Sequence, residues 1–219
     1  MATESPADLR AFVRRHTSPT DVPGIPGLRL SLASDVTTLW RAAGRELGQT
    51  DPPLPFWGFA WAGGLAVARY LLDHPDEVAG RRVVDVATGS GMLAILAARL
   101  GAGSVHAFDV DPLARAAVAV NAKLAGVRVG FSLRDPTASD SPDCDVLLAG
   151  DVCYEEVMAE RMVDWLRAAA EDGVRVLLGD PGRRYLPAGL ERLATYTVDT
   201  TRELERSEST VSAVYSIRA

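Results

Sequence analysis

Residues 83–94 read Val83-Val84-Asp85-Val86-Ala87-Thr88-Gly89-Ser90-Gly91-Met92-Leu93-Ala94, and they indicate the fold class of the chain. Its first four residues predict a buried parallel strand. The residues from Met92 predict a helix, because apolar side chains recur at helical spacing up to Leu100. Between the two, residues 88–91 predict a tight glycine-rich turn. Glycine lets a backbone approach a ligand closely, and the first N–H groups of a helix are free to bind it. The stretch therefore predicts a nucleotide-binding corner.

Two carboxylates narrow the choice of ligand. Asp109 follows a second apolar strand, where a carboxylate can accept hydrogen bonds from both hydroxyls of a ribose. Asp85 lies inside the first strand, where it would repel a pyrophosphate but attract the ammonium and sulfonium of S-adenosylmethionine. A nicotinamide cofactor stays open, because Gly89, Gly91 and Ala94 fit the looser G-x-G-x-x-A pattern. A turn without any ligand would leave both carboxylates unexplained.

The composition argues against several classes of protein. With 219 residues, 47% of them apolar, the chain is one large domain or a domain with an appendage. No apolar run reaches the roughly 18 residues of a membrane span, and residues 1–15 lack the apolar centre of a signal peptide. The net charge of −6 argues against a broad nucleic-acid surface. Cys144 and Cys153 have no metal-ligand spacing, so we expect buried free thiols, no metal site and a cytoplasmic protein.

The chain as a whole alternates between predicted strands and helices. Strands are predicted at residues 28–32, 83–86, 105–108, 127–133, 145–149, 174–178, 196–201 and 210–217. Helices are predicted at residues 5–16, 36–47, 65–74, 92–100, 112–124, 155–170 and 188–193, with a loop at 17–27. Strands joined by helices pair in parallel, whereas the last two strands have no helix between them and pair as an antiparallel hairpin. These elements predict a doubly wound, Rossmann-like α/β fold whose seven-stranded, mostly parallel sheet ends in an antiparallel C-terminal edge hairpin.

The residues before this sheet are expected to form a segment of their own. We expect residues 1–55 to form an N-terminal helical cap and residues 56–219 to form the cofactor-binding domain. The cap either covers the sheet or also serves as a lid over a substrate. Residues 56–64 then contain four aromatic side chains followed by paired glycines at a helix start. Aromatic rings usually belong to a core, but beside a sulfonium they also make cation–π contacts, and both interpretations stand.

Acidic residues recur at the carboxyl ends of the predicted parallel strands, where open α/β sheets bind their ligands. Asp135, Asp151 and Asp180 each follow one of these strands. Asp111 is interpreted as a helix cap, and Asp180, before a proline, also suits a turn. Asp151 precedes Tyr154 by three residues, and a carboxylate there can hold an amine by charge-assisted hydrogen bonds while the tyrosine orients it. These two residues are therefore the candidate catalytic pair.

Five segments resemble the seven-β-strand class I S-adenosylmethionine-dependent methyltransferases. Among these, the sequence is most similar to the electron-transfer-flavoprotein β-subunit lysine methyltransferase family and its bacterial relatives. The segments are residues 57–64, 85–91, 109–112, 150–154 and 179–183. The similarity runs from about Phe12 to the end of the chain. The glycine turn is common to hundreds of methyltransferases, whereas the tryptophan-glycine and Gly-Asp-Pro-Gly-Arg segments are more specific to this branch.

The resemblance implies a protein-lysine N-methyltransferase that acts on an electron-transfer flavoprotein β-subunit or a similar protein. The candidate cofactor-binding residues are Trp57, Trp61, Gly63, Gly64, Asp85, Thr88, Gly89, Ser90, Gly91, Asp109, Val110, Asp135 and Asp151. Asp151 and Tyr154 would lie at the target lysine. Three residues depart from the family's pattern. Ala62 replaces a proline, Ala87 replaces the first glycine of the turn, and Cys153 replaces a phenylalanine, which would remove an aromatic wall near the substrate.

Three other functions stay open on the sequence alone. The protein could transfer the methyl group to a small-molecule amine instead of a protein. The G-x-G-x-x-A pattern is also compatible with an NAD(P)-dependent oxidoreductase. Asp85, the long segment before the glycine strand and the terminal hairpin all disfavour the oxidoreductase. A binding module without activity is disfavoured by the presence of Asp151 and Tyr154.

Overall fold

The computed structural model describes residues 6–48, 50–139, 142–200 and 207–218. Its strands are β1 (Ser18–Asp21), β2 (Arg29–Leu32), β3 (Arg82–Val86), β4 (Ser104–Asp109), β5 (Gly130–Leu133), β6 (Val146–Gly150), β7 (Arg175–Asp180), β8 (Glu191–Asp199) and β9 (Ser209–Ile217). Its α-helices are α1 (Pro6–His16), α2 (Val36–Leu47), α3 (Ala62–Asp73), α4 (Met92–Arg99), α5 (Pro112–Ala125) and α6 (Glu156–Glu171). Three short 3-10 helices are η1 (Phe56–Gly58), η2 (Pro75–Glu77) and η3 (Pro136–Ala138).

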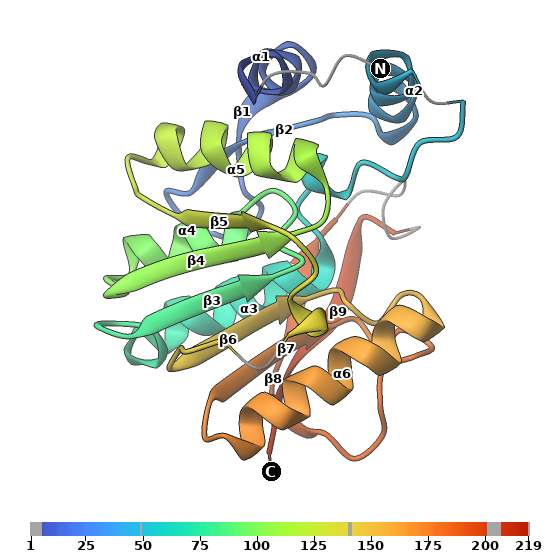
Figure 1. Ribbon diagram of the computed structural model, residues 1–219. Helices are drawn as coiled ribbons and strands as arrows, with labels where there is room; N and C mark the ends of the chain where they lie inside the picture. Colours follow the sequence, from blue (N-terminus) through green and yellow to red (C-terminus); the bar gives the residue numbers. More distant parts are fainter. Residues whose placement is uncertain (1–5, 49, 140–141, 201–206, 219) are drawn as a thin grey trace.

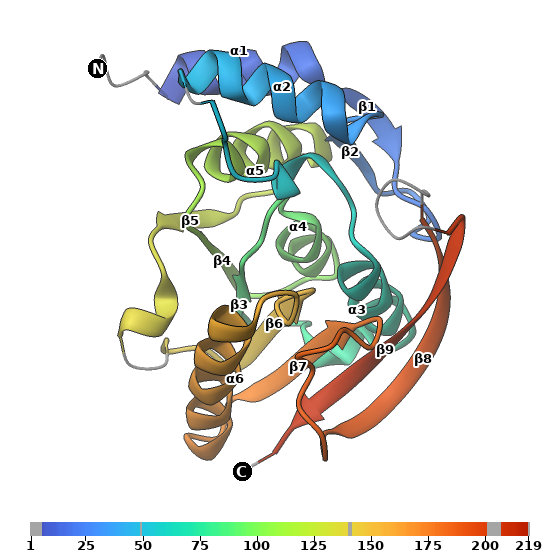
Figure 2. The same cartoon turned by 90° about the vertical axis from the view of Figure 1, so that its right-hand side faces the viewer.

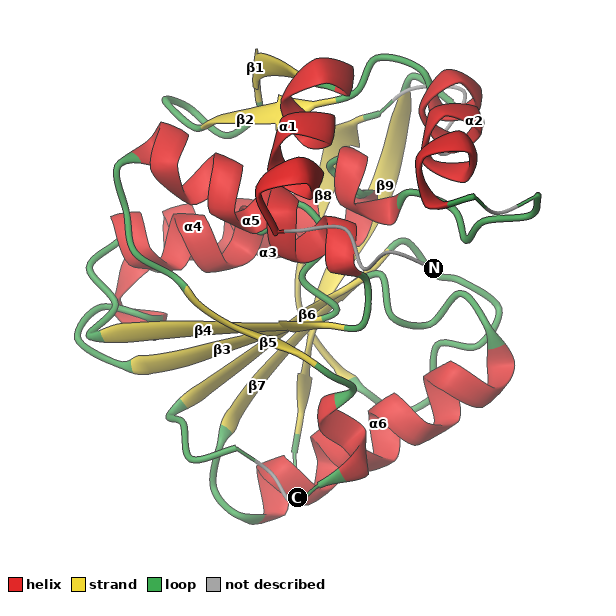
Figure 3. Ribbon diagram, turned by 45° about the horizontal axis from the view of Figure 1, so that its top comes forward, coloured by secondary structure: helices red, strands yellow, loops and turns green. Residues whose placement is uncertain are grey.

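Seven strands form one sheet in the order β5-β4-β3-β6-β7-β9-β8, and β1 pairs with β2 in a separate hairpin. The first five strands of the sheet pair in parallel, so their carboxyl ends meet at one edge. Helices α3, α4 and α5 cover one face of the sheet and α6 covers the other (Figure 1, Figure 3). The predicted doubly wound α/β architecture is confirmed.

The C-terminal hairpin lies at the edge of the sheet, as predicted. Strand β9 runs antiparallel to β7 on one side and to β8 on the other. The last strand of the chain therefore lies inside the sheet, and β8 is the edge strand. Figure 2 shows β8 and β9 curving together past α3.

Some predicted elements differ from the structure. The helix expected at residues 188–193 is wrong, because β8 begins at Glu191 and its ladder to β9 outweighs the local helical pattern. The loop expected at residues 17–27 contains β1, and the strand expected from Val127 begins only at Gly130. Helix α3 begins at Ala62, three residues earlier than expected. Residues 5 and 201, at the ends of two predicted elements, lie outside the described residues.

Buried apolar side chains form three groups. One lies between the sheet and helices α3 and α4, and a second lies between the sheet and α6. The third joins α1 and α2 to α5 through buried residues such as Phe12, Leu39, Trp57 and Leu113. The N-terminal helices therefore pack onto α5 and η1 rather than directly on the sheet (Figure 2).

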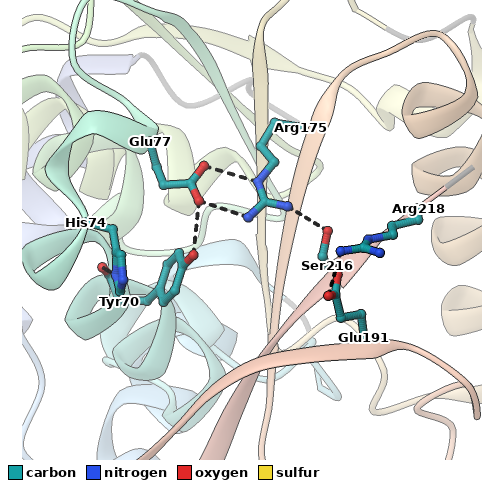
Figure 4. Close-up of polar contacts among 7 residues, drawn as sticks. All are labelled: Tyr70, His74, Glu77, Arg175, Glu191, Ser216 and Arg218. Atoms are coloured by element: carbon teal, nitrogen blue, oxygen red, sulfur yellow. Dashed lines mark hydrogen bonds and ion pairs between the residues drawn. The ribbon is translucent and has the colours of Figure 1, made fainter.

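A polar network lies at the amino ends of the strands, away from the edge where their carboxyl ends meet. Figure 4 shows Arg175, at the start of β7, donating hydrogen bonds to Glu77 and Ser216. Tyr70 donates a further hydrogen bond to Glu77 at 3.0 Å. This network ties α3 and η2 to β7 and β9. Within the described part of the chain, no helix is long and apolar enough to span a membrane.

Candidate functional site

The glycine turn joins β3 to α4 and is held by Asp85. The hydroxyl of Thr88 and the backbone N–H of Ala94, at 3.1 Å, both donate hydrogen bonds to the Asp85 carboxylate. Asp85 is 1% exposed, and this burial raises its pKa to about 7. Ala87 has a φ of 50°, the left-handed region that favours glycine, which explains why a glycine suits this position. Asp85 therefore fixes the turn, and it also lines a cavity beside the turn.

Asp109 connects the end of β4 to the same turn. Its Oδ2 accepts the backbone N–H of Gly89 at 2.9 Å, and its Oδ1 accepts the backbone N–H of Asp111 at 3.0 Å. Burial raises the pKa of Asp109. Asp111 caps α5 by accepting the N–H of Leu113 at 2.7 Å, as predicted. The carboxylate of Asp109 is thus fixed beside the glycine turn.

Four glycines bring the start of α3 against the ends of β6 and β7. Gly150 and Gly179 are register partners at the carboxyl ends of these strands. A Cβ on Gly150 would lie 2.8 Å from Gly64 Cα, and one on Gly179 would lie 2.0 Å from the carbonyl oxygen of Gly63. Any larger residue would push the helix away. The approach lets the backbone N–H of Gly64 donate to Asp151 Oδ2 at 2.9 Å.

Asp151 is held in an unusual conformation at the end of β6. Its φ is 58°, a region that L-residues other than glycine rarely adopt. Its backbone N–H donates to the carbonyl of Gly179 at 2.9 Å, and its Oδ1 accepts from the Arg183 guanidinium at 2.8 Å. Asp151 is 8% exposed, and burial raises its pKa to about 6, against the lowering effect of Arg183.

Aromatic side chains form one wall of the site. The rings of Phe56 and Tyr154 lie 5.0 Å apart, and those of Phe56 and Trp61 lie 5.5 Å apart. The Trp61 Nε1–H donates to the carbonyl of Phe56 at 3.0 Å. Trp57 is buried beneath them, and among the described residues its Nε1–H has no hydrogen-bond partner. The aromatic segment thus contributes both to the core and to the site.

These groups surround a cavity of about 830 Å³ at the carboxyl ends of the parallel strands. Of the candidate residues, the cavity is lined by Trp57, Trp61, Gly64, Asp85, Thr88, Gly89, Ser90, Asp109, Val110, Asp135, Asp151 and Tyr154. Gly63 and Gly91 are not among the residues that line it. Gly63 allows the close contact with β7. Gly91 caps α4 with a φ of 81° and lies against Val118.

Two arginines that line the cavity were not among the predicted site residues. Arg161 pairs with Asp135 at 2.7 Å, and Arg183 pairs with Asp151. Arg183 is the last residue of the Gly-Asp-Pro-Gly-Arg segment that resembles the methyltransferase family. The sequence does show that Arg183 follows the strand β7 closely, and this could have marked it as a candidate site residue. The sequence does not show which carboxylate Arg183 pairs with.

Cys153 does not form part of the cavity wall. It is fully buried in the core beside α6, so the replacement of phenylalanine by cysteine at this position changes the packing of that core, and the loss of an aromatic wall stays a prediction. Cys144 and Cys153 are both buried free thiols, as predicted. Asp180 accepts the N–H groups of Gly182 and Arg183, which confirms its interpretation as a turn residue.

The sheet order and the helices on its two faces are those of the Rossmann-like methyltransferase fold. The structure is similar to the solved structure of magnesium protoporphyrin IX methyltransferase from Synechocystis PCC 6803 with bound SAH, with a TM-score of 0.50 and 18% identity over 70% of this chain and 80% of that chain. At that identity the likeness concerns the fold. A family model described as ribosomal protein L11 methyltransferase (PrmA) matches residues 70–176.

Several relatives match almost the whole chain, and they include the following two. The electron transfer flavoprotein beta subunit lysine methyltransferase of Xenopus laevis is 33% identical over 214 residues, covering 94% of this chain and 86% of that protein. The Homo sapiens protein of the same name is 29% identical over 219 residues, covering 96% and 82%. The chain belongs to the electron transfer flavoprotein beta subunit lysine methyltransferase family, and it is a methyltransferase. This confirms the resemblance drawn from the five segments.

Proposed function

We propose that the protein transfers a methyl group from S-adenosylmethionine to a lysine of an electron transfer flavoprotein β-subunit. The observation that carries this proposal is the buried Asp151, which lines the cavity, with its carboxylate held by Gly64 and Arg183 and its backbone held by Gly179. The relatives that match almost the whole chain bear the name of this substrate. A carboxylate in a partly apolar cavity suits a lysine amine, because it can accept charge-assisted hydrogen bonds.

The charged side chains that line the cavity suit S-adenosylmethionine better than a dinucleotide. Its lining includes the five carboxylates of Asp85, Asp109, Asp111, Asp135 and Asp151. Both arginines in the lining are already paired with carboxylates, so neither is free to neutralise a pyrophosphate. A sulfonium and an ammonium gain from these acids and from the aromatic wall. This argues against the NAD(P)-dependent oxidoreductase.

Individual residues are proposed to hold the parts of the cofactor. Asp109, beside the turn, would accept the ribose hydroxyls, and Asp85 with Thr88 would lie at the methionine end. The remaining candidate residues are proposed as follows: Gly89, Ser90 and Val110 along the nucleoside, Asp135 near the base, and Trp57, Trp61 and Gly64 at the sulfonium side. Gly63 and Gly91 are proposed to act through the backbone, by letting α3 and α4 begin where they do.

The reaction demands placement more than acid–base chemistry. When bound, S-adenosylmethionine supplies an electrophilic methyl group on a sulfonium. The chain's own task is to hold the acceptor nitrogen in line with that methyl group and to exclude water. Asp151 would accept a hydrogen bond from the amine and so aim its lone pair. The aromatic wall with Tyr154 would hold the aliphatic stem, and its low polarity would lower the pKa of the amine.

The N-terminal residues are proposed to act as a cap over this site. Val36, Pro53 and Leu54 line the cavity, although helices α1 and α2 of this segment pack mainly on α5 and η1. Residues 1–55 would then complete the wall, and residues 56–219 would hold the cofactor and the catalytic pair. The two buried free thiols fit a reducing compartment, and we propose the cytoplasm.

Incubation of the purified protein with radiolabelled S-adenosylmethionine and a recombinant flavoprotein β-subunit tests the proposal. We expect a labelled β-subunit, and mass spectrometry of its peptides should place the methyl groups on lysine. The Asp151→Asn variant should lose this labelling and still bind S-adenosylhomocysteine. Label in a filtrate of small metabolites, with none in the β-subunit, would favour the small-amine alternative. Thermal stabilisation by NADH but not by S-adenosylhomocysteine would favour the oxidoreductase.

A further inference from the structure

The ion pair between Arg183 and Asp151 joins two residues that line the cavity. The two side chains meet at 2.8 Å and are 23% and 9% exposed. We propose that Arg183 is a positioning residue for methyl transfer, whose guanidinium fixes the Asp151 carboxylate and supplies its counter-charge so that the acceptor amine meets an aimed, charged partner. This inference rests on the proposed role of Asp151 and adds a residue to it.

The turn after β7 delivers Arg183 to this position. Asp180 is fully buried, and its Oδ1 accepts the backbone N–H groups of Gly182 at 2.7 Å and Arg183 at 2.6 Å. Gly182 has a φ of +90°, which an L side chain would strain. The two hydrogen bonds to Asp180 fix the backbone from which the Arg183 guanidinium extends. Arg183 therefore reaches the cavity from a defined turn rather than as a freely moving surface side chain.

The contacts of Asp151 leave room for an acceptor. Arg183 uses one site on Oδ1, and the N–H of Gly64 uses one site on Oδ2. A carboxylate offers about four lone-pair sites, so each oxygen can still accept a hydrogen bond from an amine. The acceptor can thus bind beside Arg183 without displacing it. The pair fixes the direction of the carboxylate, and because Asp151 lines the cavity, an acceptor bound there can donate to the remaining lone pairs.

Electrostatics require a counter-ion at this place. Burial and the nearby Asp180 both favour the neutral form of Asp151, and Arg183 is the cation that opposes them. The other cation of the lining, Arg161, pairs with Asp135 instead. Tyr154 and Asp85 also line the cavity, and Glu155 follows Tyr154, but none of these three brings a positive charge. With Arg183 removed, the carboxyl group would take up a proton nearer neutral pH. A protonated acid holds an ammonium or amine less well than a carboxylate does.

Three variants test the proposal in the full chain: Arg183→Met, Arg183→Lys and, as a matched control, Arg184→Met. Arg184 is the exposed neighbour, whose guanidinium lies over Tyr185. For each variant we would measure kcat/KM for the β-subunit against pH, the affinity for S-adenosylhomocysteine, and the titration of the Asp151 carboxyl carbon by NMR. The Asp151→Asn variant assigns the NMR signal.

Arg183→Met should lower kcat/KM at neutral pH by about a hundredfold, the size expected when one partner of a buried charge pair is removed. It should also move the Asp151 titration and the acid limb of the rate profile to higher pH. Affinity for S-adenosylhomocysteine should change little. Arg183→Lys keeps the positive charge, so its Asp151 titration and most of its kcat/KM should match the wild type. It is the variant to measure if Arg183→Met does not fold. Arg184→Met should behave as the wild type.

An unchanged Asp151 titration in Arg183→Met would overturn the proposal. So would a loss of S-adenosylhomocysteine affinity as large as the loss of kcat/KM, because Arg183 would then belong to the cofactor site. If the wild type labels no β-subunit, the proposed substrate fails, and the NMR titration still decides whether Arg183 controls Asp151.

Discussion

The backbone N–H of Gly64, at the start of α3, donates a hydrogen bond to the carboxylate of Asp151, at the end of β6, over 2.9 Å. The two residues are 87 positions apart in the sequence. Their contact depends on backbones that touch without side chains between them. The packing of the start of α3 on the ends of β6 and β7 therefore sets the position of the Asp151 carboxylate. A substitution that moves α3 would also move this carboxylate.

Substitution of the packing glycines tests this unit. In Gly63→Ala, the new Cβ would lie 2.3 Å from the carbonyl oxygen of Gly179 and 2.7 Å from Asp151 Oδ2. We expect a loss of about 1–3 kcal/mol in the free energy of unfolding, typical of overpacking, and a loss of activity. In Gly64→Ala the Cβ meets the mobile end of Met92 at 3.0 Å, so the loss should be smaller. Urea unfolding of both variants measures the difference; equal stabilities would contradict the close-packing explanation.

Asp109 should govern cofactor affinity. Asp109→Asn keeps the size of the side chain but removes the charge that would bind the ribose hydroxyls. We expect affinity for S-adenosylhomocysteine, measured by calorimetry, to fall by about tenfold to a hundredfold, the range for a lost hydrogen bond to a charged group. Asp143→Asn, at an exposed acid paired with Arg82 away from the cavity, is the control. An unchanged affinity in Asp109→Asn would remove the residue from the proposed site.

Asp85 should make stability depend on pH. Burial raises its pKa from 3.8 to about 7, so between these values the folded protein binds more protons than the unfolded chain. Stability should therefore fall as pH rises through this window and level off above it, by about 1.4 kcal/mol for each unit of the pKa difference. Urea unfolding of wild type and Asp85→Asn from pH 4 to 8 isolates the contribution. Parallel curves for the two proteins would show that Asp85 is not responsible.

Tyr154 should act through its ring. It is 42% exposed and packs against Phe56, so Tyr154→Ala should change stability by less than about 0.5 kcal/mol, as surface substitutions do. The same variant should lower kcat/KM for the β-subunit by about tenfold, through lost contact with the lysine stem and ammonium. Tyr154→Phe keeps the ring and should retain most of the activity. If Tyr154→Phe is as inactive as the alanine variant, the hydroxyl rather than the ring carries the role.

The network in Figure 4 should affect stability without affecting catalysis. Arg175 donates two hydrogen bonds to Glu77, at 3.1 and 2.9 Å, and the side chains are 32% and 19% exposed. Arg175→Met should cost about 1–2 kcal/mol, allowing for this partial exposure. The more exposed Arg218–Glu191 pair provides the control, and Arg218→Met should cost less than about 0.5 kcal/mol. Thermal and urea unfolding, with the methylation assay alongside, check both; a large loss of kcat in Arg175→Met would contradict the separation.

Local signals in the sequence were sufficient for most elements of the fold. The apolar strand before the glycine turn, the proline after Asp111 and the alternation in the last strand each report on neighbouring residues, so they predicted β3, α5 and β9. The residues at 188–193 show where such signals fail. Their apolar spacing suits a helix, but the pairing of β8 with the distant β9 decides their conformation.

The amino-acid sequence was enough to predict the glycine corner, its two acids and the acid-tyrosine pair, because motif spacing and strand ends fix which residues reach the same edge of a parallel sheet. Three further facts appear only in the folded chain: Gly63 packs against β7, Cys153 lies in the core, and Arg183 pairs with Asp151. The physical reason is that these facts depend on backbone approach and side-chain direction between segments far apart in the chain. The spacing of residues within one segment does not show which residue of a distant segment a side chain will contact.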